Sequence, residues 1–338
     1  MNIVYSFAGL LVTMFLSCSQ SPVFHQLSKL PDSLPNQKRD RTGTESLVFR
    51  SSDNGQTWED ISDGLPEPVQ DEQSGGRRVF FADGSGLWLT DGNGIFHSKP
   101  SFTAPFWTKA DFPDERSSIA PGKNGMYAFH YMSGIFQKEI GGAVWSPVFK
   151  EFKEKRVRGV LETADGVIFI SSDMGLYKSA DNGKTWKTLP AGGLGIKVVE
   201  SHGVLLTTGP KGIMRSTDGG ESWFWVIKEG GVGVDVAQID GGFAAVTYSA
   251  ASDTRRVRTS YDDGKTWRPI DAGLPAQRSI SSIIQVGDFF FCGHPDGILR
   301  SADKGKTWKL LLPSIEGKVF HLVVSGNVIY AIPRIAGC

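Results

Sequence analysis

The feature that most constrains this chain is a short motif that recurs along it. Five segments share the pattern Ser-x-Asp-x-Gly-x-Thr/Ser-Trp, and two more, ending at Trp107 and Trp145, keep the tryptophan but lack the aspartate. From Trp58 to Trp308 the seven tryptophans recur about every 42 residues, a spacing typical of four-stranded propeller blades. We therefore predict an all-β chain, a seven-bladed β-propeller with four antiparallel strands (A to D, from the channel outward) per blade.

The two ends of the repeat region predict how the ring closes. The first repeat, at 47–61, has only strands C and D, and the last segment has only strands A and B, at 319–324 and 328–332. Together they make one complete blade, which removes the exposed edges of an open ring. We therefore expect residues 46–338 to form the propeller, with the strand at 47–50 paired to the strand at 328–332.

The chemistry of the motif indicates a structural role. Its aspartate can accept hydrogen bonds from backbone N–H groups of its own turn, its glycine tolerates a positive φ, and its tryptophan can pack against the neighbouring blade. A calcium loop is less favoured, because each turn offers one carboxylate where Ca²⁺ needs six to eight oxygens. We therefore predict no metal and no cofactor, and assign the structural role to Asp53, Asp181, Asp218, Asp262, Asp303, Trp58, Trp186, Trp223, Trp267 and Trp308.

The N-terminal segment predicts export. Ile3 to Leu16 is apolar and uncharged, and is too short to span a bilayer comfortably, as in a signal peptide. Cys18 follows Phe15-Leu16-Ser17, which resembles the lipid-attachment site of bacterial lipoproteins; a conventionally cleaved signal or an uncleaved anchor are the alternatives. We expect residues 1–18 to be the signal, Cys18 to be lipidated, and the polar segment 19–45 to be a tether.

Charge excludes one class of partner. Lys plus Arg and Asp plus Glu number 36 each, so the chain lacks the basic field that nucleic-acid binding requires. We expect a bacterial outer-membrane or cell-surface lipoprotein, or a periplasmic or secreted protein, that contacts the membrane through its N-terminal lipid.

The repeated motif resembles the Asp-box, or bacterial neuraminidase repeat, and the resemblance covers residues 46–333. Asp-box propellers include sialidases, other glycoside hydrolases, sortilin-type receptors and photosystem II assembly-factor-like proteins, and this chain looks most like the last group and other non-catalytic propellers. Sialidases carry Arg-Ile-Pro ahead of the first box, which is missing before Ser51, and the nearest string, Arg334-Ile335-Ala336, lacks the proline. The resemblance therefore implies the fold and argues against sialidase activity.

The candidate binding residues are arginines in the D–A loops, on the face opposite the boxes. Arg77, Arg116 and Arg278 each precede the glycine of the next A–B turn by nine residues, and Arg156 and Arg158 bracket that register. We predict that they form a rim at the channel mouth that binds an anion or a carboxylate. The alternative is that they are solvated or paired with neighbouring acids, and residues also considered at this face are Asp114, Glu115, Asp173, Asp296, His130, His294, His321, Tyr131 and Tyr248.

Two functions and one covalent link remain open from the sequence. We favour a non-catalytic module, with no catalytic residues, that binds a protein, peptide or glycan; the alternative is a sialidase-like glycoside hydrolase acting on an acidic sugar, which needs two carboxylates roughly 5–10 Å apart. Cys292 and Cys338 fall near the same face of adjacent blades, so they can form a disulfide or remain two thiols.

Overall fold

The strands of the computed structural model group into seven sheets of four antiparallel strands each. The structure describes residues 48–66, 79–83, 86–90, 93–98, 106–112, 117–130, 134–152, 155–190, 197–277 and 279–334. Within these residues the helical element is a 3₁₀ turn at Lys150–Phe152. The prediction of an all-β, seven-bladed ring is confirmed.

Three blades occupy the first half of the ring. Blade 1 contains β3 (Phe80–Asp83), β4 (Gly86–Thr90), β5 (Ile95–Ser98) and β6 (Thr108–Lys109). Blade 2 contains β7 (Ser118–Gly122), β8 (Gly125–His130), β9 (Gly134–Glu139) and β10 (Ser146–Val148). Blade 3 contains β11 (Val157–Glu162), β12 (Ile168–Ser172), β13 (Gly175–Ser179) and β14 (Lys187–Leu189).

The remaining blades continue round the ring. Blade 4 contains β15 (Val198–Ser201), β16 (Val204–Gly209), β17 (Gly212–Ser216) and β18 (Phe224–Lys228). Blade 5 contains β19 (Gly233–Ile239), β20 (Gly242–Ser249), β21 (Thr254–Ser260) and β22 (Arg268–Pro269). Blade 6 contains β23 (Ser282–Val286), β24 (Phe289–His294), β25 (Gly297–Ser301) and β26 (Lys309–Pro313).

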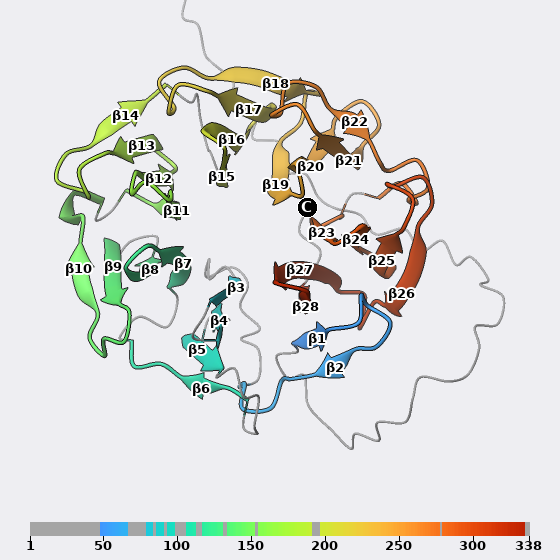
Figure 1. Cartoon of the computed structure of the whole chain (residues 1–338), viewed down its shortest axis with the longest axis horizontal. Coiled ribbons are helices and arrows are strands. Elements are labelled where there is room, and N and C mark those ends of the chain that lie inside the picture. The colour runs from blue at the N-terminus through green and yellow to red at the C-terminus, as the bar shows by residue number, and fades with distance from the viewer. Residues whose placement is uncertain are drawn as a thin grey trace, which may run out of the picture. The chain divides into compact units, whose positions relative to one another are not determined.

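Blade 7 closes the ring with strands from both ends of the described chain. It combines β27 (Val319–Ser325) and β28 (Val328–Arg334) with β1 (Phe49–Ser51) and β2 (Glu59–Asp60). β1 pairs antiparallel with β28, with Arg50 opposite Tyr330. Figure 1 shows β1 and β2 completing the sheet begun by β27 and β28, as the repeat pattern predicts.

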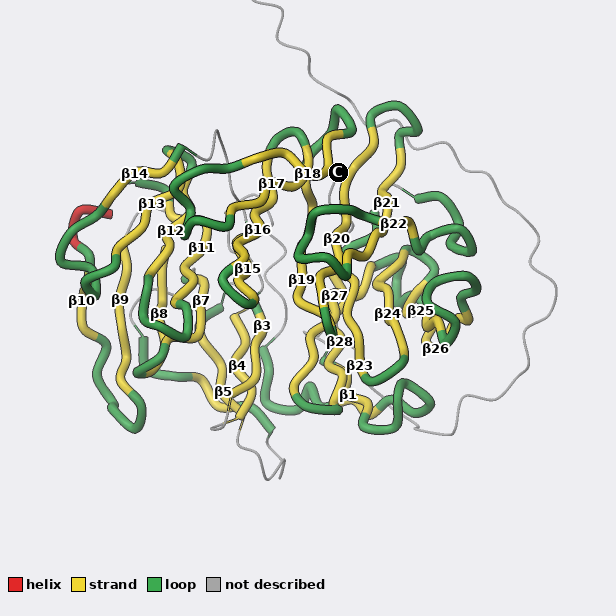
Figure 2. The backbone as a smooth tube through the Cα atoms, turned by 45° about the horizontal axis from the view of Figure 1, so that its top comes forward, coloured by secondary structure: helices red, strands yellow, loops and turns green. Residues whose placement is uncertain are grey.

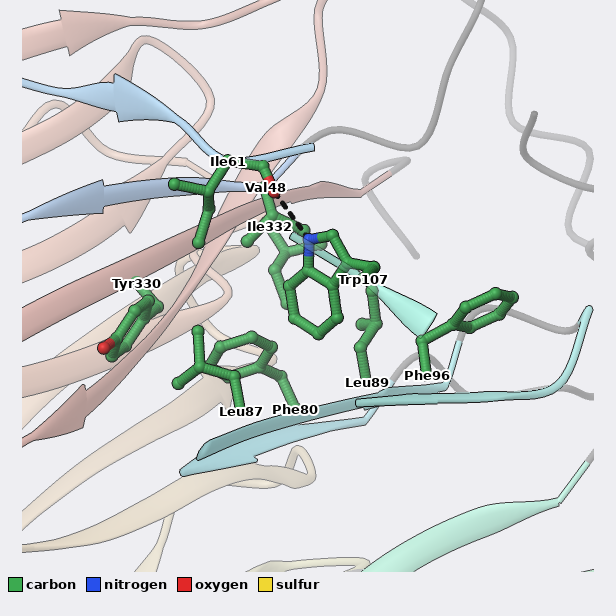
Figure 3. Packing of buried hydrophobic residues seen from close by; sticks show 9 residues of the cluster. All are labelled: Val48, Ile61, Phe80, Leu87, Leu89, Phe96, Trp107, Tyr330 and Ile332. Atoms are coloured by element: carbon green, nitrogen blue, oxygen red, sulfur yellow. Dashed lines mark hydrogen bonds between the residues drawn. The ribbon is translucent and has the colours of Figure 1, made fainter. Parts of the chain in front are cut away.

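The hydrophobic core lies between the blades. Second strands such as β12 and β16 are buried along their whole length, because each blade is covered on both faces by its neighbours. Between blades 7 and 1, the indole N–H of Trp107 donates to the Ile61 carbonyl at 2.5 Å, and the cluster also contains Phe80 and Tyr330 (Figure 3). A tryptophan whose box has lost its aspartate thus still joins two blades.

Loops form two faces of the ring, at opposite ends of the strands (Figure 2). We call the end with the A–B and C–D turns the box face; in blade 2, for example, the Ile140 N–H on the C–D turn donates to the Asn124 carbonyl on the A–B turn at 3.0 Å. The other end, with the B–C and D–A loops, is the mouth face. The predicted signal and tether, at 1–18 and 19–45, lie outside the described residues, and among those that are described no helix has the length and apolar character to cross a membrane.

Candidate functional site

The box turns are held together by their own side chains. The Asp181 carboxylate accepts the Thr185 N–H at 2.9 Å, the Thr185 hydroxyl at 2.6 Å and the Ser179 hydroxyl at 2.8 Å. The Ser179 hydroxyl oxygen in turn accepts the Gly183 N–H at 2.8 Å. Corresponding hydrogen bonds surround Asp53, Asp218, Asp262 and Asp303. The carboxylates are therefore directed into their own turns rather than outward to a ligand.

These hydrogen bonds favour the charged form of the box aspartates. The bond from the Thr185 hydroxyl, followed by the Thr185 N–H, lowers the pKa of Asp181 to about 2. The equivalent bonds from Thr307 lower the pKa of Asp303 to about 2, and those from Ser222 and Thr266 lower the pKa of Asp218 and Asp262 as well. A carboxylate that stays ionised and internally bonded serves as the fastener of a turn.

The box tryptophans link each turn to the preceding blade. The indole N–H groups of Trp58, Trp223, Trp267 and Trp308 donate to the carbonyl of the box glycine at 2.9–3.2 Å. Trp308 also donates to the Ile270 carbonyl of blade 5 at 3.0 Å. Trp186 instead packs edge-on against the rings of Phe149 and Phe152, with centroids 5.1 and 4.7 Å away.

Two of the predicted rim arginines lie at the mouth face of blade 3 and contact one carboxylate. Arg158 donates to Asp173 from Nε at 2.6 Å and from Nη2 at 3.0 Å, and Arg156 Nη1 lies 4.0 Å from the same carboxylate. The Arg156 side chain is 57% exposed and that of Arg158 is 31% exposed. Two guanidinium groups thus converge on one carboxylate.

Backbone irregularities place both arginines. Arg156 has a φ of 55°, in the left-handed region that non-glycine residues seldom adopt. The ladder between β11 and β12 slips from Val157–Ser172 to Gly159–Ser171, so Arg158 is the extra residue of a β-bulge. Bulges and left-handed residues cost free energy and are concentrated at sites where a side chain must be re-aimed. The local backbone therefore marks this end of β11 as a candidate site.

The structure adds an ion pair that the sequence analysis missed. Lys197, just before β15, places its Nζ 2.7 Å from the Asp235 carboxylate on β19, where a second bulge occurs between Gly233 and Asp235. Asp235 is 9% exposed at its side chain and Lys197 is 42% exposed. The sequence analysis missed both residues because it searched nine positions before the glycine of each A–B turn. A search from the first residue of strand A would have found them, since both lie near that end of the strand. We call Arg156, Arg158, Asp173, Lys197 and Asp235 the mouth cluster.

The mouth cluster spans three consecutive blades, because β11, β15 and β19 are neighbouring innermost strands (Figure 1). The charge of Lys197 in this cluster also acts on a histidine of blade 7. Burial, followed by the positive charges of Arg334 and Lys197, lowers the pKa of His321 on β27 well below its usual value. Apolar side chains lie on the same face: Met174, 65% exposed, follows Asp173, and Val232, 46% exposed, precedes β19.

Several of the other residues considered from the sequence make local contacts within the mouth-face loops. His294 is fully buried, with Nε2 3.1 Å from the Pro275 carbonyl and Nδ1 accepting the Asp296 N–H. Asp296 thus lies beside this histidine, and Tyr248 donates to Asp253. No group of three or more His, Cys, Asp or Glu side chains is arranged to hold a metal within the described ranges.

Several predicted residues fall outside the described part of the chain. They are Cys18, Arg77, Asp114, Glu115, Arg116, Tyr131, Arg278 and Cys338. The convergence of all the rim arginines therefore stays a prediction. Cys292 is buried on β24, and burial raises the pKa of its thiol. Because Cys338 lies outside the described residues, a disulfide between the two cysteines stays a prediction.

Tyr127 and Glu162 form a hydrogen-bonded pair at the box face. Tyr127 donates to Glu162 at 3.0 Å and is 1% exposed. Burial, followed by the charge of Glu162, raises the pKa of Tyr127, so its phenol stays protonated. This pair packs blade 2 against blade 3 and lacks the properties of a nucleophile.

No family model matches this chain. No curated protein matches it either. Solved structures do, and those described below are seven-bladed β-propellers. The GH74 xyloglucanase from Xanthomonas campestris has a TM-score of 0.61 and 17% identity, over 86% of this chain and 55% of that chain.

Two shorter proteins match over nearly their whole length. A catalytically inactive virginiamycin B lyase from Staphylococcus aureus, in a structure with quinupristin, has a TM-score of 0.60 and 15% identity over 78% of this chain and 97% of its own. YCF48 bound to D1 peptide has a TM-score of 0.54 and 14% identity over 78% and 98%. The chain spans about half the length of the GH74 enzymes, 44% of an ancestral one and 55% of the xyloglucanase. At these identities the likeness concerns the fold.

Proposed function

We propose that this chain is an exported, membrane-anchored and non-catalytic propeller that binds an acidic segment of a protein or peptide at its mouth face. The observation that carries the proposal is the mouth cluster, which gathers two arginines and a lysine around two carboxylates at the inner ends of three adjacent blades. The left-handed Arg156 and the bulge at Arg158 supply independent support, since such strain is typical of binding sites.

Two properties of the mouth cluster favour an acidic peptide. Guanidinium groups bind carboxylates through parallel hydrogen bonds, and the Arg156 side chain is 57% exposed and therefore accessible to a ligand. Met174 and Val232 add exposed apolar surface beside these charges, which suits side chains of a peptide better than a bare sugar ring. A propeller with bound peptide, YCF48, supports the capacity of the fold for this role.

The alternative is a glycoside hydrolase, favoured by the likeness to GH74 enzymes. Such an enzyme needs one carboxylic acid and one carboxylate across a cleft. Of the acids in the mouth cluster, Asp173 is bonded to Arg158 and Asp235 to Lys197, so both carboxylates are already engaged by cations. The mouth cluster therefore supports binding better than hydrolysis.

Binding is tested by screening the purified protein against an array of synthetic peptides that differ in acidic content and against a glycan array. We expect acidic peptides with apolar neighbours to bind, and the double variant Arg156→Ala, Lys197→Ala to lose that binding. Lys184→Ala, an exposed lysine of the box face, is the matched control. Binding should weaken as salt rises from about 0.05 to 0.2 M, because screening shortens the range of the charges.

The opposing results are equally concrete. Peptide binding that survives the double variant at both salt concentrations contradicts the assignment of the mouth cluster. Turnover of chromogenic glycosides, including sialosides, would establish the enzymatic alternative. The variant Arg116→Ala, Arg278→Ala extends the test to rim arginines outside the described residues.

Export and anchoring have their own test. We expect the chain, expressed in a bacterium with its own N-terminus, to enter the detergent phase of a membrane extract. Cys18→Ser should move it to the aqueous phase, because a thioether-linked lipid requires the thiol. Equal partition of the two proteins would contradict lipid attachment and leave binding at the mouth cluster unaffected.

A further inference from the structure

The C–D turn of blade 2 exposes an uncharged apolar run. Residues 140–144, Ile-Gly-Gly-Ala-Val, replace a box turn, and we call them the apolar tip. Ile140 is 79% exposed and Val144 is 74% exposed, the two largest exposures among the large hydrophobic residues of the described chain. Consecutive exposed apolar residues are disfavoured in a soluble protein unless they have a function.

The base of the apolar tip is firmly built. The Ile140 N–H donates to Asn124 at 3.0 Å, and the Gly142 N–H donates to Glu139 at 3.0 Å. Below the tip, Lys138 Nζ lies 5.8 Å from the Trp88 ring and 5.9 Å from the Trp145 ring, and Trp145 packs against Phe112. The packing therefore holds the apolar tip out from the box face.

Loss of the box in this turn removes the side-chain hydrogen bonds that hold an intact box. Residues 140–144 contain no serine, threonine or aspartate, so the turn has none of the bonds that surround Asp181. The buried Trp145 N–H has no hydrogen-bond partner within the described residues, but the same is true of Trp186 in the intact box of blade 3. The turn thus gives up the box bonds and exposes two hydrophobic side chains, which indicates a role other than stability.

We propose that the apolar tip enters the headgroup region of the membrane that carries the protein. The proposal rests on the export and anchoring proposed above, and it orients the box face toward the bilayer and the mouth cluster away from it. Lys138 and the exposed Lys123 on the adjacent A–B turn lie beside the tip, together with the exposed acid Glu139, and exposed Asp165 interacts with Lys123. Apolar side chains with charged neighbours that include lysines suit the interfacial region.

The size of the tip and the tether favour a lipid surface over a protein partner. Two large side chains present far less area than the roughly 800 Å² per partner of a stable protein interface. β1 begins at the mouth face, so a tether ahead of it has to pass the ring before the box face can meet the bilayer. Residues 19–45 would have a root-mean-square span of roughly 30 Å as a flexible tether and up to about 90 Å when extended, which is long enough. At the resulting effective concentration even weak partition is sufficient.

The test uses a polarity-sensitive fluorophore on single cysteines. In a Cys338→Ser background, a hexahistidine tag replaces residues 1–18, so that nickel-chelating lipid holds the ring by its own tether, independently of Cys18. Ile140→Cys and Val144→Cys place the probe on the tip. Tyr261→Cys, in the intact box turn of blade 5 and 54% exposed, is the matched control on the same face.

Vesicles of phosphatidylethanolamine and phosphatidylglycerol are then added. We expect a blue shift and quenching by doxyl-labelled lipid at positions 140 and 144, with neither at 261, and loss of the signal at 144 when Ile140→Asp is introduced. Emission at 140 and 144 that matches the control at 261 overturns the proposal. Because the tag replaces the lipid, failure of anchoring at Cys18 would not affect this outcome, and failure of the tip would not affect binding at the mouth.

Discussion

At the scale of single residues, each box turn is stabilised by a buried hydroxyl combined with an ionised carboxylate. Ser179 is 1% exposed and joins the Gly183 N–H to Asp181, so the serine is the inner half of the fastener and the aspartate the outer half. The glycine is required as well: Gly183 has a φ of +79°, and a Cβ there would lie 1.9 Å from the Phe149 ring. The motif is therefore read from sequence with few ambiguities, because every position has its own steric or bonding reason.

Removing either half of a box should lower stability. Ser179→Ala leaves the Gly183 N–H without its acceptor and should cost about 1–2 kcal/mol in the free energy of unfolding. Asp181→Ala should also lower the unfolding midpoint, because Thr185 loses two bonds. Urea unfolding measures both, with Lys184→Ala, an exposed residue of the same turn, as the control. Midpoints equal to the parent would show that the box does not stabilise the fold.

The box aspartates also predict how stability responds to acid. Their folded-state pKa is depressed, to about 2 for Asp181 and Asp303, so their contribution is complete above the unfolded-state pKa near 4 and is lost as pH falls toward 2. We expect the urea midpoint to fall between pH 4 and 2 and to change less between pH 7 and 5. Asp181→Asn should show a shallower acid dependence than the parent. A parent midpoint that stays constant from pH 5 to 2 would contradict this.

At the scale of elements, arginines next to the boxes connect consecutive blades. Arg215, before the box of blade 4, donates to the Asp263 carbonyl in the box of blade 5 at 2.6 Å. Arg300, at the same position in blade 6, donates to the Asn54 carbonyl in blade 7 at 2.8 Å. Lys178 holds this position in blade 3 and lies 3.8 Å from Glu221 instead. The repeat thus encodes a contact between blades as well as a turn within one.

The arginine contact between blades 6 and 7 should contribute to ring closure. Arg300→Ala removes the bond to Asn54 and a cation–π contact at 4.7 Å with Phe289, and should cost about 1–2 kcal/mol. Lys178→Ala is the matched control and should cost less, because a largely solvent-screened ion pair contributes little. Thermal unfolding of both variants measures the difference. A larger effect at Lys178 than at Arg300 would contradict the assignment.

At the scale of the whole molecule, closure by blade 7 makes the two ends of the ring interdependent. β1 supplies the third strand of that blade, and Phe49 packs against Phe320 with ring centroids 6.1 Å apart. Without β1, β28 becomes an open edge with unpaired N–H and C=O groups. The stability of every blade therefore depends on a strand that lies more than 250 residues away in sequence from its partner.

Two N-terminal deletions distinguish the contribution of the closing strand β1 to stability from that of the predicted tether. Deleting residues 1–51 should lower the melting temperature and promote aggregation through the exposed edge of β28. Deleting residues 1–45 removes only the predicted signal and tether and should leave the melting temperature unchanged. Thermal unfolding with size-exclusion chromatography distinguishes the two truncated proteins. Equal stability after both deletions would contradict closure by β1.

The repeat by itself determined the fold: seven blades, four strands in each, and closure of the last blade by both termini. These properties follow from sequence because box turns, their glycines and their tryptophans are local signals that recur at a fixed interval. The ends of individual strands shifted by one or two residues; the strands expected at 319–324 and 328–332 are Val319–Ser325 and Val328–Arg334.

Only the tertiary structure decided how the mouth face is arranged. The Lys197–Asp235 ion pair joins residues 38 apart, and it depends on a bulge that changes the register of β19. Arg158 reaches Asp173 through a second bulge, and Arg156 through a left-handed backbone. Such irregularities carry no periodic signal, because each interrupts the hydrogen-bond ladder of a single blade at one position. Likewise, the letters Ile-Gly-Gly-Ala-Val predict a turn, but packing at its base determines that Ile140 and Val144 stay exposed.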